Sequence, residues 1–408
     1  MTHDVGRHDI VVLGGGYTGM TAALTTARRT RRYGGRVVLV NPWPRFVERL
    51  RMHQLAAGQR LNEYDIPTIL AGSGVDFVCG AATSIDADDR RVRVDTAGST
   101  RSLRYDTLVY AIGPRTETLA VPGAGQHAYT FSTADEAARF AAEITALPHG
   151  AVVAVCGGGL TGVEAATELA ETNPGLRVML ISREEPGSMM GPKARAHLNR
   201  ALRRLGVQVR SGVGIAKVLP DAVELADGEL IPCDTRLWTA GVTVAPLAVE
   251  AGIATDERGR VITDPTLRSV SHPSVHAIGD AAAIRQSYGV IHGTCQSGIP
   301  SGAYLAEAIS RRLRGRHPKG FRFGYLHQPV SLGRRDAVIQ FTYPDDTPRR
   351  WLLTGRPAVL YKEAVTSSPL TTFRLARRVP VPSRFLAGRG GRRNRVPDLN
   401  SAGGGDAR

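Results

Sequence analysis

The chain is poor in aromatic residues and lacks long hydrophobic runs. Phe, Trp and Tyr make up 6% of its 408 residues, against 42% for all hydrophobic types. No apolar stretch approaches the roughly 18 residues that a membrane-spanning helix needs, and the polar leader before Ile10 has no hydrophobic signal region. We therefore expect a cytoplasmic protein. The length allows two or three domains with full cores, and the composition is typical of an α/β protein.

The chain also lacks closely spaced cysteines. Its four, Cys79, Cys156, Cys233 and Cys295, are each about 60 to 80 residues from the next. This spacing provides no metal knuckle and no redox dithiol. We expect all four to be buried as small apolar side chains, and we predict no metal site.

Acidic residues are scarce in the last quarter of the chain. Residues 311–408 hold 21 Lys and Arg against 6 Asp and Glu, whereas residues 1–310 hold 31 of each sign. The basic block therefore carries the whole net charge of +15. Peripheral contact with an anionic membrane and a merely solvated tail are both open explanations. Nucleic acid is not an expected partner, because no aromatic interleaving or known reader motif accompanies the arginines.

Two glycine-rich turns of one design are the strongest positive signal. GGGYTG spans Gly14 to Gly19, and GGGLTG spans Gly157 to Gly162. Each follows a short apolar run and precedes an alanine-rich helical pattern, which is the strand, turn and helix context of the G-x-G-x-x-G fingerprint. The spaced glycines allow a tight bend, the approach of a pyrophosphate and close helix packing. Two copies indicate two dinucleotides and electron transfer between them.

The residues around each turn predict a βαβ unit. The first has a helix at Met20–Arg32 and a strand that ends at Asn41. The second has a strand at Ala151–Cys156, a helix at Val163–Glu171 and a strand that ends at Ser182.

Five segments together, GGGYTG, YDTLVYAIGP, GGGLTGVE, WTAGV and AIGDAA, resemble in order and spacing the two-dinucleotide-binding-domain flavoproteins of the pyridine nucleotide oxidoreductase group. Within that group the chain is most similar to the type II NADH dehydrogenases, over roughly residues 9–310. The resemblance implies an α/β fold with two Rossmann-like domains, one for FAD and one for NAD(P)H, and a small C-terminal α+β region. The implied parts are 1–120 and 241–317 for FAD, 121–240 for NAD(P)H, 318–385 for the C-terminal domain and 386–408 for a disordered basic tail.

The resemblance also assigns cofactor residues. FAD would be bound by Gly14, Gly16, Gly19, Asn41, Gly113, Gly279 and Asp280, with Asp280 at the ribityl and phosphate region and Asn41 in place of the usual ribose-binding acid. NAD(P)H would be bound by Gly157, Gly159, Gly162, Ser182, Arg183 and Gly241. A hydroxyl and a guanidinium at Ser182 and Arg183 suit a 2′-phosphate and slightly favour NADPH, although Glu184 and Glu185 would repel it. NADH remains the alternative.

Two residues are implied at the reaction centre. Glu164 would lie near the nicotinamide and flavin rings and tune the site, unless it is only a carboxylate favoured by the helix dipole. Gln296 matches the first glutamine of the quinone pocket, whereas Pro300 replaces the second. The stretch from Pro44 to Gly58, where related disulfide reductases carry a cysteine pair, contains no cysteine and excludes thiol–disulfide chemistry.

These features predict an FAD-dependent oxidoreductase that takes a hydride from NAD(P)H and passes electrons to a quinone or quinone-like acceptor. A soluble oxidoreductase of a specialised pathway, acting on a non-respiratory small molecule, is the first alternative. A flavin-binding redox sensor with little turnover is the second. Pro357 and Pro369 interrupt the C-terminal helical pattern, so contact with the inner membrane face would be electrostatic and reversible. A homodimer is a further open possibility.

Overall fold

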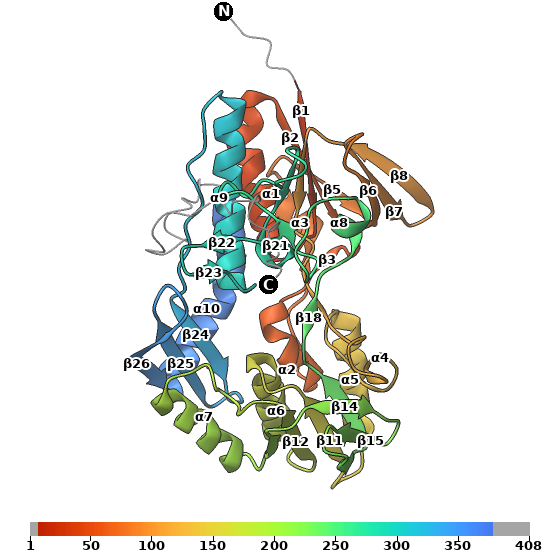
Figure 1. The fold of residues 1–408 in the computed structure, drawn as a ribbon, viewed down its shortest axis with the longest axis vertical. Coiled ribbons are helices and arrows are strands. Elements are labelled where there is room, and N and C mark those ends of the chain that lie inside the picture. Colours follow the sequence, from red (N-terminus) through yellow and green to blue (C-terminus); the bar gives the residue numbers. More distant parts are fainter. Residues whose placement is uncertain (1–6, 378–408) are drawn as a thin grey trace, which may run out of the picture.

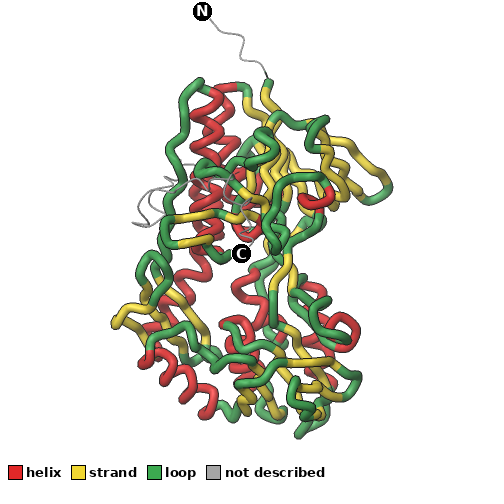
Figure 2. The backbone as a smooth tube through the Cα atoms, viewed as in Figure 1, coloured by secondary structure: helices red, strands yellow, loops and turns green. Residues whose placement is uncertain are grey.

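The computed structural model describes residues 7–377, which form two sheet-containing halves and a C-terminal sheet and helix (Figures 1 and 2). The expected disordered tail, residues 386–408, lies outside the described residues. No helix within residues 7–377 combines the length and the apolar character that crossing a membrane requires.

The first half is built on a parallel sheet of five strands. Their order across the sheet is β20 (Val275–Ala277), β9 (Thr107–Tyr110), β1 (His8–Leu13), β2 (Gly35–Asn41) and β5 (Val75–Cys79). Strands β1 and β9 are almost entirely buried, as expected of parallel strands covered on both faces. Helices α1 (Tyr17–Thr30) and α9 (Cys295–Leu313) pack against each other beside it (Figure 1). The first predicted βαβ unit is thereby confirmed.

The second half repeats this design with four parallel strands. The order is β13 (Gln208–Ser211), β12 (Arg177–Ser182), β11 (Val152–Cys156) and β17 (Thr235–Trp238). Helices α5 (Ala134–Ala146), α6 (Leu160–Thr172) and α7 (Pro192–Arg204) contribute buried side chains to the same core as the sheet. The second βαβ unit is confirmed as well, and the α/β fold with two Rossmann-like domains is established.

A narrow antiparallel ribbon joins the two halves. Strand β10 (Arg115–Thr116) leads into the second half, and β18 (Val242–Thr243), which is hydrogen-bonded to it, leads back. The second domain is therefore an insertion between β9 and β20, which are neighbours in the first sheet.

The C-terminal unit is a three-stranded antiparallel sheet followed by a long helix. Strands β24 (His327–Ser331), β25 (Ala337–Thr342) and β26 (Pro348–Thr354) precede α10 (Gly355–Ala376). The expectation that prolines interrupt this region is wrong. Pro357 lies in the first turn of α10, where its missing amide hydrogen is not needed. Pro369 lies inside the helix, where the Ser368 hydroxyl donates a 2.8 Å hydrogen bond to the Val365 carbonyl that a proline cannot reach.

Smaller elements complete the fold. In the first half they are η1 (Arg31–Tyr33), β3 (Arg45–Phe46), η2 (Arg49–Arg51), α2 (Met52–Ala56), β4 (Tyr64–Asp65), α3 (Ile66–Leu70), β6 (Ala81–Asp86), β7 (Arg91–Thr96) and β8 (Ser99–Arg104). In the second half they are α4 (Ala124–His127), β14 (Ile215–Val218), β15 (Ala222–Leu225) and β16 (Leu230–Pro232). After the ribbon come α8 (Leu247–Glu250), β19 (Val261–Ile262), η3 (Gly279–Ala281), β21 (Ala282–Ala283), β22 (Arg285–Gln286) and β23 (Gly289–Val290).

Candidate functional site

The first glycine turn leaves open space at the start of α1. Gly14 has φ +102°, a conformation that favours glycine, and it makes the bend after β1. A methyl group added at Gly19 would lie 1.8 Å from the Gly14 carbonyl oxygen, so α1 packs directly on the turn. A methyl group at Gly16, by contrast, would meet nothing within 4 Å. The open position faces a helix N-terminus, where backbone amides attract a phosphate.

The second glycine turn has the same geometry. Gly157 has φ +126°, and a methyl group at Gly162 would lie 1.8 Å from the Gly157 carbonyl oxygen. Gly159, the N-cap of α6, again has open space at its Cβ position. Each half of the molecule therefore has open space beside its glycine turn at the carboxyl end of its sheet, where open α/β sheets bind ligands.

The polar residue that ends the next strand closes each turn. The Asn41 side-chain oxygen accepts a 2.8 Å hydrogen bond from the Gly15 amide, and its amide nitrogen donates to the Trp43 carbonyl at 2.7 Å. Ser182 lies against Gly158 and donates a hydrogen bond to the Glu184 carbonyl. Both predicted ribose-side residues thus first fix the backbone, and each keeps at least one further acceptor site for a ligand.

Asp280 lies beside a second set of close glycine contacts. Gly279, at φ +65°, brings the chain against Thr18 of α1, and a methyl group at Gly293 would lie 2.4 Å from the Asp280 carboxyl carbon. Burial raises the pKa of Asp280, while the charges of Arg49 and His292 oppose that rise. The Arg49 guanidinium would also meet a methyl group at Gly113, at 3.9 Å. An open cradle, a carboxylate and a nearby guanidinium fit the pyrophosphate and hydroxyl groups of FAD.

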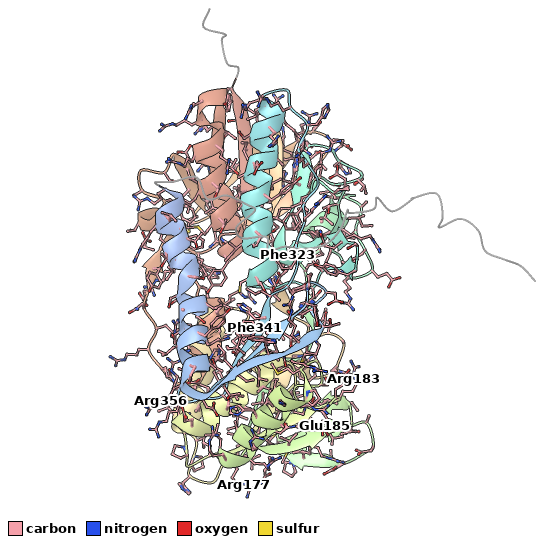
Figure 3. All side chains as sticks on the ribbon, turned by 90° about the vertical axis from the view of Figure 1, so that its left-hand side faces the viewer. Arg177, Arg183, Glu185, Phe323, Phe341 and Arg356 are labelled. Atoms are coloured by element: carbon pink, nitrogen blue, oxygen red, sulfur yellow. The ribbon has the colours of Figure 1, made fainter. Side chains whose placement is uncertain are left out.

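An exposed arginine follows β12 of the second domain, next to two acidic residues that accept hydrogen bonds from serines. Glu184 accepts a hydrogen bond from the Ser188 hydroxyl at 2.9 Å, and Glu185 accepts one from Ser211 at 2.6 Å. Arg183 is exposed in the same segment, and Figure 3 places it near Glu185 at the rim of this domain. Gly241, at φ +73°, lies in the ribbon that joins the two halves. Its carbonyl oxygen accepts a hydrogen bond from the Glu117 amide.

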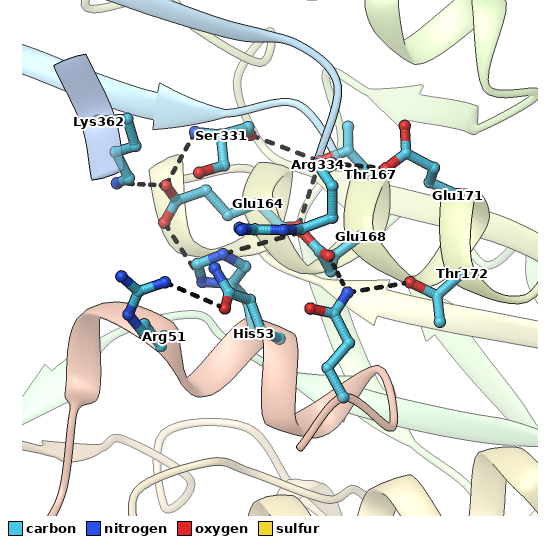
Figure 4. A network of polar contacts seen from close by, with 12 residues as sticks. Arg51, His53, Glu164, Thr167, Glu168, Glu171, Thr172, Ser331, Arg334 and Lys362 are labelled. Atoms are coloured by element: carbon cyan, nitrogen blue, oxygen red, sulfur yellow. Dashed lines mark hydrogen bonds and ion pairs between the residues drawn. The ribbon is translucent and has the colours of Figure 1, made fainter. Parts of the chain in front are cut away.

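Three parts of the molecule meet at Glu164, in the second turn of α6. Its Oε1 atom accepts a 2.7 Å hydrogen bond from Lys362 Nζ of α10 and a 3.0 Å bond from the Ser331 amide of β24. Its Oε2 atom lies 3.8 Å from Nδ1 of His53, on α2 of the first domain (Figure 4). Although burial alone would raise it, the pKa of Glu164 lies below its usual value because Lys362 and His53 favour the charged form. Glu164 is therefore an ionised carboxylate at a junction of three units.

A second carboxylate lies behind His53. Glu168, one turn along α6 from Glu164 and fully buried, has its Oε2 atom 4.0 Å from His53 Nε2. Its Oε1 atom accepts a hydrogen bond from Gln59. Burial raises the pKa of Glu168 to about 7 and lowers that of His53 to about 4.

Gln296 is bound to backbone on both sides of its amide. Its nitrogen donates to the His327 carbonyl at 3.1 Å, and its oxygen accepts the Leu326 amide at 2.7 Å. The side chain fixes the start of β24 on the start of α9. Gln296 thus ties α9 to β24, the strand whose Ser331 amide binds Glu164.

The cysteines follow the expectation only in part. Cys156 and Cys233 are buried, but Cys79 is exposed at the end of the edge strand β5, and Cys295 is half-buried at the start of α9. The assumption that all four are buried is wrong, because β5 ends at the rim of its sheet. Among residues 7–377 no cluster of His, Cys, Asp and Glu has the arrangement of a metal site.

The sequence analysis missed His53, Glu168 and Lys362. A compositional signal was available for one of them, since only four of the 52 basic residues are lysines, and Lys362 is buried while the other three are exposed. His53 stands in the stretch noted only for its lack of cysteine.

Comparisons with known proteins agree with this arrangement. Residues 8–302 match the pyridine nucleotide-disulphide oxidoreductase family. An NADH dehydrogenase-like protein of Mycobacterium tuberculosis is 31% identical over 380 residues, which cover 88% of this chain and 93% of that protein. A type II NADH:quinone oxidoreductase of Staphylococcus aureus is 25% identical over 391 residues, covering 88% and 94%.

Solved structures show the same fold. The sulfide:quinone oxidoreductase of Aquifex aeolicus superposes with a TM-score of 0.77 at 20% identity, over 90% of this chain and 92% of that one. NDH2 of Plasmodium falciparum in complex with NADH gives a TM-score of 0.76 at 16% identity, over 91% and 97%. FAD and NAD(P)H binding is typical of proteins with these paired domains. The chain belongs to the pyridine nucleotide-disulphide oxidoreductase family.

Proposed function

We propose that this protein is an FAD-dependent oxidoreductase that takes electrons from NAD(P)H and passes them to a quinone or quinone-like acceptor. The observation that carries the proposal is the convergence of three structural units on the ionised Glu164, one helical turn after the second of two matching glycine turns. The similarity to a type II NADH:quinone oxidoreductase and to demethylphylloquinone reductase of Synechocystis, 28% identical over 350 residues, supports this acceptor class.

In this proposal each residue group has a defined task. The start of α1, with Gly14, Gly16 and Gly19, binds the FAD pyrophosphate, and Asp280 and Asn41 hold its hydroxyl groups. The start of α6, with Gly157, Gly159 and Gly162, binds the pyrophosphate of NAD(P)H, while Gly113 and Gly241 allow the chain to pass close to the rings. When bound, the two dinucleotides supply the electron transfer, so the protein needs no nucleophile.

The protein's own contribution is orientation and proton handling. Quinone reduction by NAD(P)H takes up one proton from the medium for each pair of electrons. The Lys362 ammonium stabilises Glu164 as a carboxylate, and the two groups together hold a proton at the junction of the domains. Gln296, through the backbone of Leu326 and His327, keeps α9 and β24 in register beside them. Glu164 therefore tunes the rate and its pH dependence.

A screen of acceptors on the purified yellow protein tests this function. Dithionite should bleach the flavin, and NAD(P)H should bleach it rapidly, with reoxidation by menadione at a rate far above that by oxygen. Slow bleaching and a long-lived charge-transfer complex would instead identify the redox sensor. Rapid bleaching without reoxidation by any quinone would favour the specialised oxidoreductase, an alternative that Pro300 in the place of a second glutamine supports.

The same chemistry suggests a preference for NADPH. Ser188 and Ser211 hold the carboxylates of Glu184 and Glu185, and the exposed Arg183 beside them could meet a 2′-phosphate.

Arg183→Ala should therefore weaken NADPH selectively. A charge-assisted contact of this type is worth roughly 1.5–3 kcal/mol, or about 10- to 150-fold in affinity, and NADH should be almost unaffected. The measurement is the KM for each nucleotide, with Arg177→Ala as a control on an exposed arginine at the other end of the same strand. An unchanged ratio of the two KM values would contradict the preference.

A further inference from the structure

The structure contains a buried acid–base series that leads away from Glu164. From the C-terminal helix it runs through Lys362, Glu164, His53 and Glu168 to Gln59 (Figure 4). Only the first and last links are direct hydrogen bonds. The two middle links, at 3.8 Å and 4.0 Å, lie just beyond hydrogen-bond distance, and a small side-chain shift would close either one.

His53 Nε2 and Glu168 Oε2 face each other without another partner. Both atoms are buried, and neither makes a hydrogen bond. A buried polar atom without a partner costs about 1–3 kcal/mol, so a facing pair of such atoms indicates a hydrogen bond that forms in at least one state of the protein. The Oε1 atom of Glu168 is already bound to Gln59, which leaves Oε2 directed toward the imidazole.

Proton counting decides where the hydrogen must be. A neutral imidazole has one N–H group and one lone pair, and His53 stands between two carboxylates. If both carboxylates were ionised, one of them would face the lone pair. A proton on Glu168 Oε2 removes this conflict, because Glu168 then donates to Nε2 while Nδ1–H faces the ionised Glu164.

The charges around His53 favour the same arrangement. The charges of Lys362 on α10, Arg334 after β24 and Arg51 just before α2 oppose a positive imidazole, whereas Glu164 favours one. Burial outweighs Glu164 and keeps the pKa of His53 low. For Glu168, burial outweighs the opposing effects of Gln59 and Arg334, and the charges of Glu171 and Glu164 add to it, so that its pKa is high.

We propose that Glu168 stores a proton and that His53 passes it to Glu164 when the acceptor is reduced. The proton leaves Glu168 Oε2 for His53 Nε2, and His53 releases the hydrogen on Nδ1 to the Glu164 carboxylate. The overall reaction, NAD(P)H + H⁺ + quinone giving NAD(P)⁺ + quinol, consumes this one proton. Glu168 regains it from the solvent at the edge of α6, where Gln59 contacts Thr172, an exposed residue. His53 and Glu168 are positioning residues, since both act through Glu164, and this role rests on the proposed function.

The first test examines the resting holoenzyme without turnover. Infrared spectra recorded from pH 5 to 9 should contain the band of a protonated carboxyl group that disappears with a midpoint near neutral pH. Glu168→Gln should remove the band while preserving the packing, because its side-chain amide has the shape of a protonated carboxyl group and can donate to His53. Glu171→Gln, one turn further along α6, removes a neighbouring charge without touching His53 and should retain the band. A band that persists in Glu168→Gln, or no titrating band in the wild type, would overturn the proposal.

The second test compares acceptors that differ in their need for protons. Menadione takes up protons on reduction, whereas ferricyanide takes only electrons. His53→Gln and Glu168→Gln should slow menadione reduction at pH 6, where Glu168 is protonated in the wild type, by about 100-fold, the lower end of what a positioned proton donor contributes. Their ferricyanide rates should stay near wild type, and the solvent isotope effect on menadione reduction should change. Equal loss with both acceptors would show a structural role and refute the relay. A wild-type protein that does not reduce menadione would contradict the proposed function, while the carboxyl band would still decide whether Glu168 stores a proton.

Discussion

At the scale of single residues, the ion pair between Glu164 and Lys362 connects the second domain to the C-terminal helix. Its formation requires that both charged groups lose most of their contact with water. Both side chains are nearly buried, at 13% and 9% exposure, and their atoms lie 2.7 Å apart. Removing one partner leaves an uncompensated buried charge, which destabilises a protein far more than loss of a surface pair.

Lys362→Met should therefore lower the free energy of unfolding by about 3 kcal/mol, as measured in guanidinium or urea. Adding Glu164→Gln should restore much of this loss, because it removes the stranded charge. Arg210→Ala, which breaks an exposed pair with Glu229, is the matched control and should cost less than about 1 kcal/mol. A Lys362→Met variant as stable as this control would show that Glu164 is not buried as described.

Glu168 should make stability depend on pH in a defined window. Its folded pKa, about 7, lies above the usual 4.5, so the folded state binds the proton more tightly. The stabilisation is complete below pH 4.5 and is lost as the pH rises through 7. The shift corresponds to about 3 kcal/mol. As the pH rises through this window, the free energy of unfolding of the wild type should fall by about this amount relative to that of Glu168→Gln. If the free energies of unfolding of the two proteins changed in parallel with pH, the assignment would be refuted.

Residue spacing alone could locate the two glycine turns but not the polar centre. Gly16 and Gly159 are identified because their motif is local in the chain. The partners of Glu164 come from residues 53, 331 and 362, and nothing in their local sequence signals a common position. Arginine-rich composition makes a buried lysine informative, but only burial reveals which lysine matters.

At the scale of elements, the two glycine turns were predicted correctly because each combines a strand, a bend and a helix within one short segment. The helices begin earlier than predicted, at Tyr17 and Leu160, since the glycine turn runs directly into the first helical turn. Helix α10 was not predicted, because the prolines in its pattern indicate breaks, whereas one lies in the first turn and a serine hydroxyl compensates for the other.

The turns make a sharp mutational contrast possible. Gly16→Val and Gly159→Val place a side chain into open space at an extended backbone, so both variants should fold. Gly16→Val should lose FAD, whereas Gly159→Val should remain yellow, bleach with dithionite and fail to bleach with NAD(P)H. The measurements are the flavin absorbance of purified protein and its reduction rate.

Gly19→Ala supplies the contrasting case, since its methyl group would overlap the Gly14 carbonyl oxygen and should impair folding as well as FAD binding. Full FAD occupancy in Gly16→Val would contradict the assignment of the first turn. Equal loss of FAD in Gly16→Val and Gly159→Val would contradict the division of labour between the turns.

At the scale of the whole molecule, the sequence already shows that the positive charge is concentrated in the C-terminal quarter. The structure shows that exposed aromatic and aliphatic side chains lie in the same region. Trp351 of β26 is 77% exposed and Leu360 of α10 is 73% exposed, with Arg349, Arg350 and Arg356 exposed in the same unit. Figure 3 shows Arg356 at the end of the C-terminal unit, beside the second domain. Such a mixture suits a reversible contact with an anionic leaflet.

Binding to vesicles that contain anionic lipid should accordingly be measurable by co-sedimentation and should weaken between low and 0.5 M salt. Each arginine near such a surface contributes about 1 kcal/mol, and screening acts within about 10 Å at 0.1 M salt. Neutral vesicles serve as the control and should not bind. A protein that ignores anionic vesicles even at low salt would be better explained by a solvated tail and by the soluble, specialised oxidoreductase.

The insertion of the second domain has a consequence for biosynthesis. Strand β20 and helix α9, which complete the first sheet and cover α1, leave the ribosome only after the whole second domain has been made. Synthesis proceeds at about 5–20 residues per second, so the nascent first half waits many seconds with α1 and one side of β9 uncovered. The inserted domain has all of its own strands by then and can fold first. The half that begins to be synthesised first is therefore completed last. The growing chain most needs protection from aggregation during this interval.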